Sequence, residues 1–414
     1  MFTCRINKRK AEKVISFGKM PIANGFLNKE QFSKEYFFEL AVAFGLDSKM
    51  LQLIEQPDPK MMFHENYAFF SSSSKKMAEH FERMANNYLT NFITDQEKSF
   101  VIELGSNDGI MLRHFAKSGI KHLGIEPSLN VAKIAQQNGI NTISEFFGVD
   151  TAINVEKTYG KADLISAANV MCHISDLNSV GEGINILLKD KGIFVFEDPY
   201  LGDVIQKTSY DQIYDEHVYI FSLQSVTNAF APYGLKVFHV EPQITHGGSM
   251  RYYLCRDGAY SIRNSVKQQL ELELNLGLDK IETYIQFAKN CEKNKKEFVN
   301  LLKELKSNNK RVVGYAATSK STTVLNYCGI GPDLIEYICD TTPIKQGKFS
   351  PGMHIPIKSY EYFKKDKPDY VILFAWNHMQ EIFEKEQDFV ASGGKWIVFV
   401  PEIKILSIEE SLVY

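Results

Sequence analysis

The feature that most constrains the fold is a repeated alternation of buried strand, glycine-containing turn and amphipathic helix. FVIELGSNDG, residues 100–109, is an apolar run that ends in a turn, and IMLRHFAKSG, residues 110–119, is a helical pattern closed by glycine. KHLGIEPS, residues 121–128, and NVAKIAQQNG, residues 130–139, repeat the pair. Strands and helices that alternate at this spacing are typical of a doubly wound parallel sheet. The sequence therefore predicts a Rossmann-like α/β fold.

Further apolar runs divide the chain into four predicted parts. ADLISAANVM, GIFVFEDPY and LKVFHVEP add strands to the first sheet, and apolar residues from Ile281 to Leu305 recur at the spacing of a long amphipathic helix. RVVGYAATSKSTTVLNYCG, from residue 311, begins a second strand–turn–helix unit. The N-terminal segment has short apolar pieces, too few for a core of its own, so we expect it to lean on a neighbour. We predict a small irregular N-terminal domain (1–75), an α/β domain (76–257), a helical linker (258–308) and a second α/β domain (309–414).

Composition and charge exclude several classes of protein. The 47 basic and 50 acidic residues give a net charge of −3, which leaves no electrostatic footprint for nucleic acid. No apolar run has the length of a membrane span, and the N-terminus MFTCRINKRKAEK lacks the apolar region of a signal peptide. The six cysteines form no CxxC pair, which favours a reducing compartment. We expect a cytoplasmic enzyme that is a monomer or a weak homo-oligomer.

The first glycine-containing turn carries the residues expected to bind a cofactor, which are Glu103, Gly105, Ser106, Asn107, Asp108 and Gly109. Glu126, followed by Pro127, ends the next strand, where an acid can accept hydrogen bonds from both hydroxyls of a ribose. This spacing suits either a dinucleotide or S-adenosyl-L-methionine (SAM), and a purely structural turn is the alternative. An acidic side chain in the loop repels phosphate but suits a ligand with ammonium and sulfonium groups. The turn therefore favours SAM.

Several motifs, taken in order, resemble one family. They are YAFFSSSS, IELGSNDGIML, IEPSLNVA, ANVMCHISDL, YDQIYDEHVYIFSL, THGGSMRYY and KQGKFSPGMHIPI. The chain is similar over essentially its whole length to the SAM-dependent sugar C-methyltransferases, which act on nucleotide-linked keto-deoxysugars. Those enzymes make branched sugars for antibiotics and for bacterial surface polysaccharides. The resemblance implies a class I methyltransferase domain flanked by a zinc-binding-type N-terminal domain and a C-terminal α/β domain.

Carbon methylation gives the candidate catalytic residues their predicted roles. A carbon beside a carbonyl must lose a proton before it can attack a sulfonium methyl group, and His217 is a suitable base because an imidazole titrates near neutral pH. The resemblance assigns this role to His217 and implies that Glu216 orients it or binds substrate, while Tyr214 donates to the enolate oxygen. It also implies that His173 and Tyr67 line the pocket. Two further residues, Asn169 and Met171, are expected beside the methionine or adenine of SAM, and Asp215 is expected to be a surface charge.

The second α/β domain offers a candidate site for the nucleotide part of a substrate. Its first turn places four polar residues at a helix start, where backbone N–H groups can cradle a diphosphate, namely Thr318, Ser319, Lys320 and Ser321. Lys345 and Lys348 are expected to add positive charge. The domain shows no lean glycine motif and no ribose-binding acid at the expected place, so a duplicated fold without a ligand is the alternative. In THGGSMR, Ser249 and Arg251 are expected near the sugar, although a tight turn explains the glycines nearly as well.

One departure from the family concerns zinc. The resembling enzymes carry two CxxC pairs near the N-terminus, whereas this chain has Cys4 with Asn7, Gly45 and Ser48 at the matching positions. One thiol cannot hold a tetrahedral zinc ion, so we expect a metal-free domain held by packing. Two other functions stay open, a SAM-dependent O- or N-methyltransferase and a catalytically dead scaffold. An NAD-dependent oxidoreductase is disfavoured because the glycine fingerprint is missing.

Overall fold

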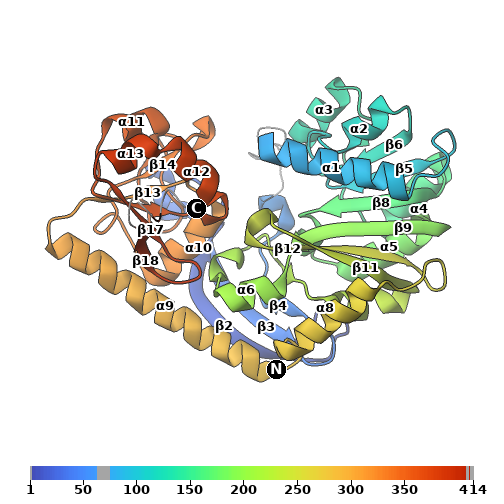
Figure 1. Cartoon of the computed structure of the whole chain (residues 1–414), viewed down its shortest axis with the longest axis horizontal. Coiled ribbons are helices and arrows are strands. Elements are labelled where there is room, and N and C mark those ends of the chain that lie inside the picture. The colour runs from blue at the N-terminus through green and yellow to red at the C-terminus, as the bar shows by residue number, and fades with distance from the viewer. Residues whose placement is uncertain (1, 63–74, 407–409, 411–414) are drawn as a thin grey trace.

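Three β-sheets organise the chain, as a computed structural model that describes residues 2–62, 75–406 and 410 shows (Figure 1). The central sheet has the order β11-β12-β9-β8-β5-β6-β7. Its strands, in chain order, are β5 (Phe100–Leu104), β6 (Lys121–Ile125), β7 (Thr142–Ile143), β8 (Ala162–Ala168), β9 (Leu188–Pro199), β11 (Leu235–Gln243) and β12 (Ser249–Arg256). Only β12 pairs antiparallel with its neighbours, β9 and β11. The predicted doubly wound sheet is confirmed, with one strand reversed.

Helices cover both faces of the central sheet. On one face, apolar side chains of α4 (Val149–Tyr159), α5 (Leu177–Leu187) and α7 (Leu223–Phe230) join one core cluster. On the other face, α1 (Lys75–Asn91), α2 (Leu112–Lys117) and α3 (Leu129–Gln137) contribute to a second cluster. Such two-sided cover explains why the strand sequences are continuously apolar and do not alternate.

A second α/β unit follows with the sheet order β15-β14-β13-β16-β17-β18. Its strands are β13 (Val312–Tyr315), β14 (Ile338–Asp340), β15 (Ile357–Ser359), β16 (Tyr370–Leu373), β17 (Lys395–Val398) and β18 (Lys404–Leu406), and its helices are α10 (Ser319–Cys328), α11 (Tyr360–Lys365), α12 (Met379–Lys385) and α13 (Gln387–Ala391). All strand pairs are parallel except β17 with β18. The strand order reverses between β13 and β16, the point at which open α/β sheets bind ligands.

The N-terminal segment differs from the irregular piece that was expected. It forms an antiparallel sheet of β1 (Phe2–Thr3), β2 (Lys10–Pro21), β3 (Phe37–Gly45) and β4 (Leu51–Leu53), and β10 (Tyr219–Ile220) is its fifth strand. Short apolar pieces suffice for such strands because the apolar face packs on other parts of the chain. Ile15, Phe17 and Leu40 lie in one core cluster with side chains of the long helix α9 and of α10. The expectation that this segment leans on a neighbour is confirmed.

The degenerate zinc position is a compact pair of turns. Lys8 and Lys49 both adopt left-handed backbone angles, with φ of 59° and 58°. Cys4 Sγ lies 3.1 Å from Ser48 Oγ, so these two side chains form a hydrogen bond. A Cβ atom at Gly45 would stand 2.3 Å from Ser48 Oγ and 3.2 Å from Cys4 Sγ. Cys4, Gly45 and Ser48, three of the four positions that match the zinc ligands, thus lie close together. A thiol–hydroxyl contact between Cys4 and Ser48 joins the two turns.

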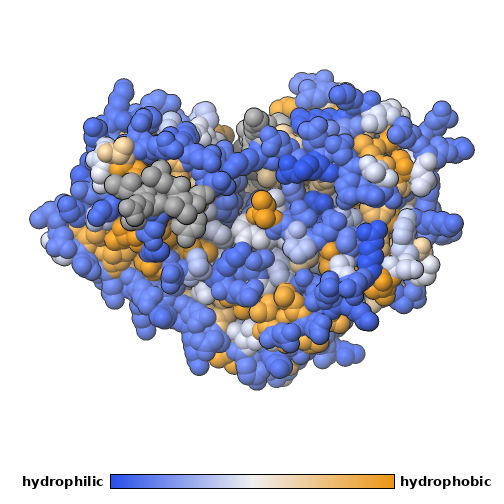
Figure 2. Space-filling view, viewed as in Figure 1, coloured by the Kyte–Doolittle hydropathy of each residue, from blue (hydrophilic) through white to orange (hydrophobic). Residues whose placement is uncertain are grey.

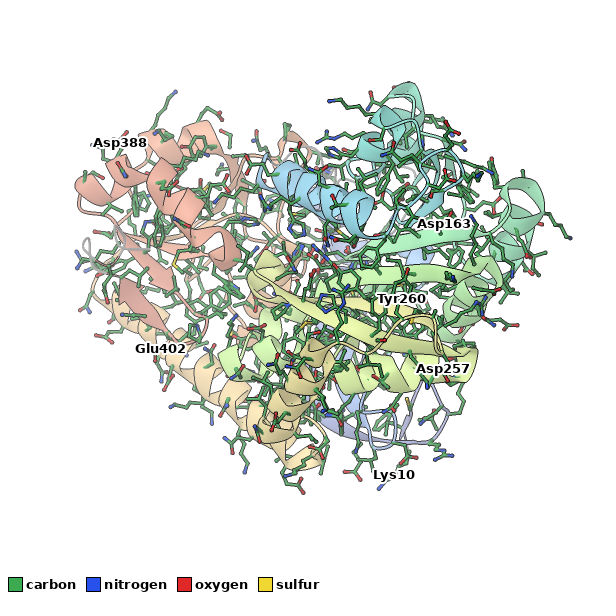
Figure 3. All side chains as sticks on the ribbon, turned by 45° about the vertical axis from the view of Figure 1, so that its right-hand side comes forward. Lys10, Asp163, Asp257, Tyr260, Asp388 and Glu402 are labelled. Atoms are coloured by element: carbon green, nitrogen blue, oxygen red, sulfur yellow. The ribbon has the colours of Figure 1, made fainter. Side chains whose placement is uncertain are left out.

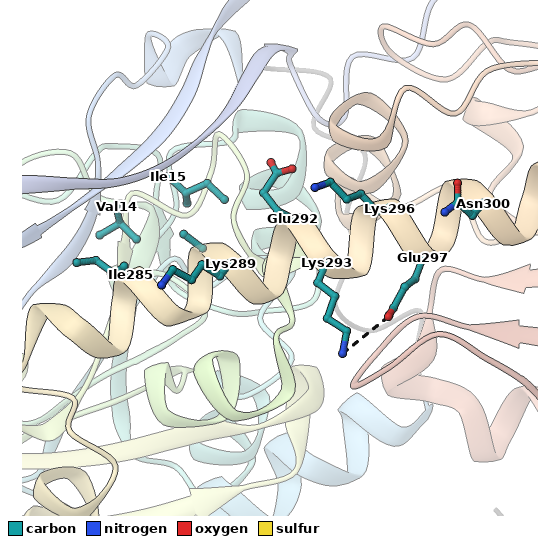
Figure 4. Close-up of a pocket in the computed structure, with 10 residues that line it drawn as sticks. Val14, Ile15, Ile285, Lys289, Glu292, Lys293, Lys296, Glu297 and Asn300 are labelled. Carbon is teal, nitrogen blue, oxygen red and sulfur yellow. Dashed lines mark ion pairs between the residues drawn. The ribbon is translucent and has the colours of Figure 1, made fainter.

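Helices α8 (Asn264–Asn275) and α9 (Ile281–Ser307) link the two α/β units, and α9 runs along the N-terminal sheet toward the second unit (Figure 1). The predicted amphipathic stripe is confirmed, since Tyr284, Cys291 and Leu302 are buried, but Ile285 is 47% exposed. Ile285 lies in a surface groove of about 640 Å³ between α9 and β2, where Lys293 pairs with Glu297 (Figure 4). None of the candidate site residues lines this groove.

The surface of the molecule is shown from one face in Figure 2. The face in Figure 2 is mainly hydrophilic, and hydrophobic side chains gather near α8, where Leu272 and Leu274 are each 47% exposed. In Figure 3, Asp163 and Asp257 lie on the side of the central sheet away from Asp388 in the second α/β unit. Among the described residues, no helix is both long and apolar enough to cross a membrane.

Candidate active site

The turn after β5 contains two glycines whose backbone angles and close neighbours disfavour any side chain. Gly105 and Gly109 have φ of +61° and +81°, angles that residues with a side chain rarely adopt. A Cβ at Gly105 would lie 2.4 Å from a methyl carbon of Val170, and one at Gly109 would lie 2.8 Å from Ile140. The turn therefore runs close to the neighbouring loops and has no room for larger residues.

Glu126 ties this turn to the end of β6. Its Oε2 accepts a hydrogen bond from the Asn107 backbone N–H at 3.0 Å, and its Oε1 accepts one from the Ser128 N–H at 2.8 Å. Burial raises the pKa of Glu126, and these two hydrogen bonds oppose that rise. Each oxygen retains a second lone pair, so the carboxylate is positioned to accept hydroxyl hydrogens as well. Pro127 follows directly and leads into α3.

Other polar groups in the turn are buried without hydrogen-bond partners among the described residues. Glu103 Oε2 and Ser106 Oγ are such atoms. The pKa of Glu103 is raised well above its ordinary value, by burial first and then by the charges of Asp108 and Glu126. A ligand that carries positive charge and hydrogen-bond donors satisfies these acids at the same time. The donor set therefore fits the ammonium, sulfonium and ribose of SAM.

Asn169 and Met171 follow β8 at the same edge of the sheet. Asn169 has φ of +55°, and its backbone N–H donates to the carbonyl oxygen of Glu197 at 2.7 Å. Met171 is fully buried and belongs to the apolar core cluster under the sheet. Both residues thus lie at the carboxyl end of β8, and Met171 has a structural place in the core, while their contact with SAM stays a prediction.

The segment from Tyr214 to His217 forms the centre of the site. His217 Nδ1 lies 2.7 Å from the carbonyl oxygen of Gln212, so Nδ1 carries the hydrogen and donates it. His217 Nε2 therefore holds the lone pair, and the Tyr214 hydroxyl, 2.7 Å away, donates to it. Burial, and then the nearby His173, lower the pKa of His217 well below its ordinary value. The imidazole is neutral, with its basic nitrogen defined.

His173 lies beside His217. The two ring centroids are 5.3 Å apart and the rings are inclined by 21°, so the imidazoles are nearly stacked. Burial lowers the pKa of His173 to about 4. The short helical turn Met171–His173 after β8 brings this residue to the site. Tyr67, the remaining predicted lining residue, lies outside the described residues.

Glu216 and Asp215 are both held by the N-terminal segment. Glu216 Oε1 accepts a hydrogen bond from Asn24 Nδ2 at 2.7 Å, and the backbone N–H of Ala23 donates to Asp215 at 3.2 Å. The expectation that Asp215 is a surface charge is wrong, because the residue is 1% exposed. Burial and the charge of Glu216 raise the pKa of Asp215 well above its ordinary value. Burial also raises the pKa of Glu216, opposed by Asn24 and Lys345.

Helix α10 brings the second α/β unit against this segment. The hydroxyl of Thr322 donates to the Ala23 carbonyl at 2.9 Å, and that of Thr323 donates to the Ile213 carbonyl at 2.8 Å. Lys320 lies with Nζ 3.2 Å from Asn377 Oδ1 and 3.5 Å from the His246 carbonyl. Burial lowers the pKa of Lys320 to about 8. Of the residues predicted to bind substrate in the second α/β unit, Lys320 thus contacts the first unit, at the carbonyl of His246.

The other hydroxyls of the predicted diphosphate cradle have local partners. Thr318 Oγ1 accepts a hydrogen bond from the Ser321 N–H at 3.1 Å, and Ser321 Oγ donates to the Thr318 carbonyl at 2.6 Å. These contacts form a capping box at the start of α10, which Ser319 opens. Lys348 is half-buried, and its backbone N–H donates to the Lys345 carbonyl at 3.2 Å. The geometry therefore gives Thr318 and Ser321 a capping role.

The second α/β unit contains an acid, Asp340, at the position that corresponds to Glu126 in the first unit, where none was expected. Asp340 ends β14, and its carboxylate accepts from the backbone N–H groups of Ala317 and Thr342, each at 2.7 Å. Glu126 makes the same two kinds of contact in the first unit. Asp340 and Ala316 help to line a cavity of about 240 Å³ near the carboxyl ends of β13 and β14. The acid that ends YICD, about one strand–helix unit after the turn, was the signal in the sequence.

Ser249 and Arg251, predicted near the sugar, both have partners within the protein. Ser249 Oγ donates to the Thr245 carbonyl at 3.0 Å. The Arg251 guanidinium donates twice to Glu197 Oε2, at 3.0 and 2.7 Å, and lies 3.4 Å from Glu241. Hydrogen bonds and charge from His80 and Arg251 overcome burial and lower the pKa of Glu197 to about 2. Arg251 is therefore the centre of a buried ion-pair network.

His246 is a residue that sequence reasoning missed. Its backbone is left-handed, with φ of 55°, and its Nε2 is buried without a hydrogen-bond partner among the described residues. Burial first, and then the charge of Lys320, lower the pKa of His246 to about 3. Gly247 follows with φ of +87°, and a Cβ there would lie 2.1 Å from the Trp376 ring. The THGG turn thus fits tightly against the second α/β unit.

Comparison with known proteins agrees with this architecture. Residues 77–240 match the family described as "Methyltransferase domain", and residues 244–401 match "C-methyltransferase C-terminal domain". Residues 4–63 match "Putative zinc binding domain". The C-methyltransferase NovU of Streptomyces niveus is 32% identical over 402 residues, which cover 96% of this chain and 95% of that protein.

The chain belongs to this C-methyltransferase family. It is a SAM-dependent C-methyltransferase, and its methyltransferase domain takes SAM as the cofactor.

Two solved structures share a lower similarity. Magnesium protoporphyrin IX methyltransferase of Synechocystis PCC 6803, with bound SAH, is 12% identical, covers 44% of this chain and 83% of its own, and has a TM-score of 0.35. The plantazolicin methyltransferase BpumL, in complex with SAH, is 15% identical, covers 45% of this chain and 88% of its own, and also has a TM-score of 0.35.

Proposed function

We propose that this C-methyltransferase methylates a carbon beside the carbonyl of a nucleotide-linked keto-deoxysugar, as a step toward branched sugars. The motifs shared with the sugar C-methyltransferases support this substrate class. The observation that carries the proposal is the state of His217, a neutral imidazole whose Nδ1–H is donated to the Gln212 carbonyl at 2.7 Å. Its Nε2 lone pair is thereby oriented for proton abstraction, which is the step that carbon methylation needs.

Each neighbour of His217 has a proposed part. His217 Nε2 takes the proton from the sugar carbon. The Tyr214 hydroxyl, which donates to Nε2 in the structure, turns to the sugar carbonyl oxygen when substrate binds, which frees the Nε2 lone pair and places a donor at the developing enolate oxygen. Glu216, fixed by Asn24 at 2.7 Å, binds a sugar hydroxyl and stabilises the imidazolium. His173 closes the other side of the base.

The cofactor and the nucleotide have separate proposed places. SAM, when bound, supplies an electrophilic methyl group. Glu126 accepts its ribose hydroxyls, and Glu103 with Asp108 attracts its cationic amino-acid part. In the second α/β unit, Asp340 and the cavity of about 240 Å³ receive the nucleoside, and Lys320 neutralises charge on the diphosphate.

Two matched variants test the division between the sites. Titration calorimetry with SAM and with its demethylated product measures the first. We expect Glu126→Gln to weaken both by at least about tenfold, since a charged acceptor is lost, and Asp340→Asn to leave both unchanged. Loss of SAM affinity in Asp340→Asn, or none in Glu126→Gln, contradicts the assignment.

Deuterium exchange tests the chemistry. Candidate nucleotide-linked keto sugars are incubated in D₂O with the enzyme and demethylated cofactor, and the α-hydrogen signal is followed by NMR. Wild type is expected to wash out that hydrogen, while His217→Asn slows the exchange about 10²–10⁴-fold and Tyr214→Phe slows it about 10²–10³-fold. Methylation without exchange in wild type indicates transfer to oxygen or nitrogen and refutes the proposal.

A further inference from the structure

Three side chains in the site carry metal-binding atoms that converge. One ligand atom each from Cys172, His173 and His217 lies within 4.8 Å of the others. In the described part of the chain, this is the one group of three or more His, Cys, Asp or Glu side chains with such convergence. Cys172 and His173 come from the turn after β8, and His217 comes from a segment more than forty residues later. Tertiary structure, and not local sequence, brings them together.

The three atoms form a donor set that zinc prefers. Structural and catalytic zinc sites use thiolate sulfur at about 2.3 Å and imidazole nitrogen at about 2.0–2.1 Å, which places tetrahedral ligands roughly 3.5 Å apart. Side-chain shifts of about 1 Å or less bring atoms within 4.8 Å to that spacing. The rings of His173 and His217 are near-parallel, with centroids 5.3 Å apart.

Outer contacts also suit a metal site. His217 donates Nδ1–H to the Gln212 carbonyl at 2.7 Å, and metal-binding histidines usually fix their second nitrogen in this way. One contact opposes metal binding, because burial and then the neighbouring carboxyl group of Asp198 raise the pKa of the Cys172 thiol, which the metal must deprotonate. Three protein ligands leave the fourth tetrahedral position open, and the Tyr214 hydroxyl lies 2.7 Å from His217 Nε2. A water or hydroxyl oxygen can fill that position.

The N-terminal zinc position offers a contrast. There Cys4 is the one thiol, and its Sγ contacts the hydroxyl of Ser48 at 3.1 Å. That position therefore lacks the donors that the family's zinc needs, while the site around Cys172 has three. Zinc added to this protein has a better donor set in the methyltransferase domain.

We propose that Cys172, His173 and His217 bind a borderline-soft divalent metal such as Zn²⁺, and that the bound metal inhibits the enzyme. On binding, the Cys172 thiol releases its proton to solvent and the sulfur bonds to the metal. His217 Nε2 gives its lone pair to the metal, so its hydrogen bond from Tyr214 breaks and the base is occupied. The inhibitory part rests on the proposed function of His217, whereas the binding part does not.

The binding test uses the full chain, freed of metal by a chelator, and Zn²⁺ alone as the probe. Calorimetry in two buffers of different ionisation heat is expected to show one Zn²⁺ per chain with proton release. Loss of an outer contact weakens metal binding by about 10–100-fold, and Cys172→Ser should weaken Zn²⁺ binding by more than that because it removes a ligand. Cys4→Ser is the matched control and should bind as wild type does. Cd²⁺ should give a thiolate charge-transfer band in wild type and in Cys4→Ser but not in Cys172→Ser.

The results separate this inference from the proposed function. No Zn²⁺ binding by wild type, or binding lost in Cys4→Ser and kept in Cys172→Ser, overturns the metal site. SAM affinity, measured for each variant, shows that the fold is intact. Zn²⁺ should also stop methyl transfer and a chelator should restore it, with Cys172→Ser resistant. Binding without any loss of turnover overturns the inhibitory part and shows that His217 is not the required base.

Discussion

The imidazole of His246, whose Nε2 atom is buried, makes a specific prediction about acid stability. Its pKa is lowered to about 3 in the folded chain, compared with about 6.5 in an unfolded one. The fold thus favours the neutral ring, and the stability from this residue is complete above pH 6.5 and decreases as pH falls below it. We expect His246→Asn to remove this dependence. Asparagine tolerates the left-handed backbone at this position, φ 55°, better than most residues do.

The magnitude follows from proton linkage. At pH 5.5 an unfolded histidine is about ten parts protonated to one part neutral, so unfolding gains about RT ln 11, or about 1.4 kcal/mol. This value is insensitive to the folded-state pKa so long as that pKa lies below about 4.5. The predicted quantity is a double difference, namely the loss of unfolding free energy from pH 8 to pH 5.5 in wild type minus the same loss in His246→Asn.

Urea denaturation at the two pH values measures this difference. Tryptophan fluorescence is a suitable signal, since the Trp376 ring lies against the neighbouring Gly247. We expect wild type to lose about 1.4 kcal/mol more than the variant. A double difference near zero means that His246 titrates normally in the fold, and a negative value means that it is protonated there. Either result refutes the burial argument.

Two further variants test packing and the buried charges. Gly247→Ala should destabilise the contact with Trp376 and raise the fluorescence change on mild heating, because its Cβ would lie 2.1 Å from that ring. Gly258 has φ of +80° but nothing within 4 Å of an added Cβ, so Gly258→Ala should lower the unfolding free energy only by the backbone strain, about 1–2 kcal/mol. Equal losses of unfolding free energy in Gly247→Ala and Gly258→Ala contradict the packing explanation. Arg251→Met should lower the unfolding free energy by about 3–5 kcal/mol, since it leaves Glu197 buried without its main partner. Chemical denaturation at pH 8 measures it, and a loss under 1 kcal/mol shows that water replaces the guanidinium.

Local patterns in the sequence predicted much of the fold. Strand–helix alternation predicted the central sheet, and the glycines predicted the tight turn after β5, because backbone angles there are set within one strand–helix unit. The capping box of Thr318 and Ser321 was also a local signal, since the two residues are three positions apart. The prediction of an anion cradle did not take account of the hydrogen bonds that each hydroxyl makes with the backbone of the other residue.

Long-range contacts explain the features that were missed. Asp215 is buried because the backbone N–H of Ala23, 192 residues earlier, donates to it. The N-terminal sheet was read as irregular because its apolar face is completed by α9 and its edge by β10. Arg251 was assigned to substrate because no pattern reveals that its partner, Glu197, lies opposite on the next strand. Such pairings depend on how the sheet is assembled.

The late addition of β10 to the N-terminal sheet has a consequence for synthesis on the ribosome. Tyr219 pairs with Gln52, and Ile220 pairs with Leu51. At about 5–20 residues per second, the nascent chain presents β4 for roughly 8–33 s before its partner strand is made. During that time an unpaired strand edge is open to other chains. Expression at low temperature lengthens this interval, so we expect aggregation during translation to depend on elongation rate more strongly than on the stability of the finished protein.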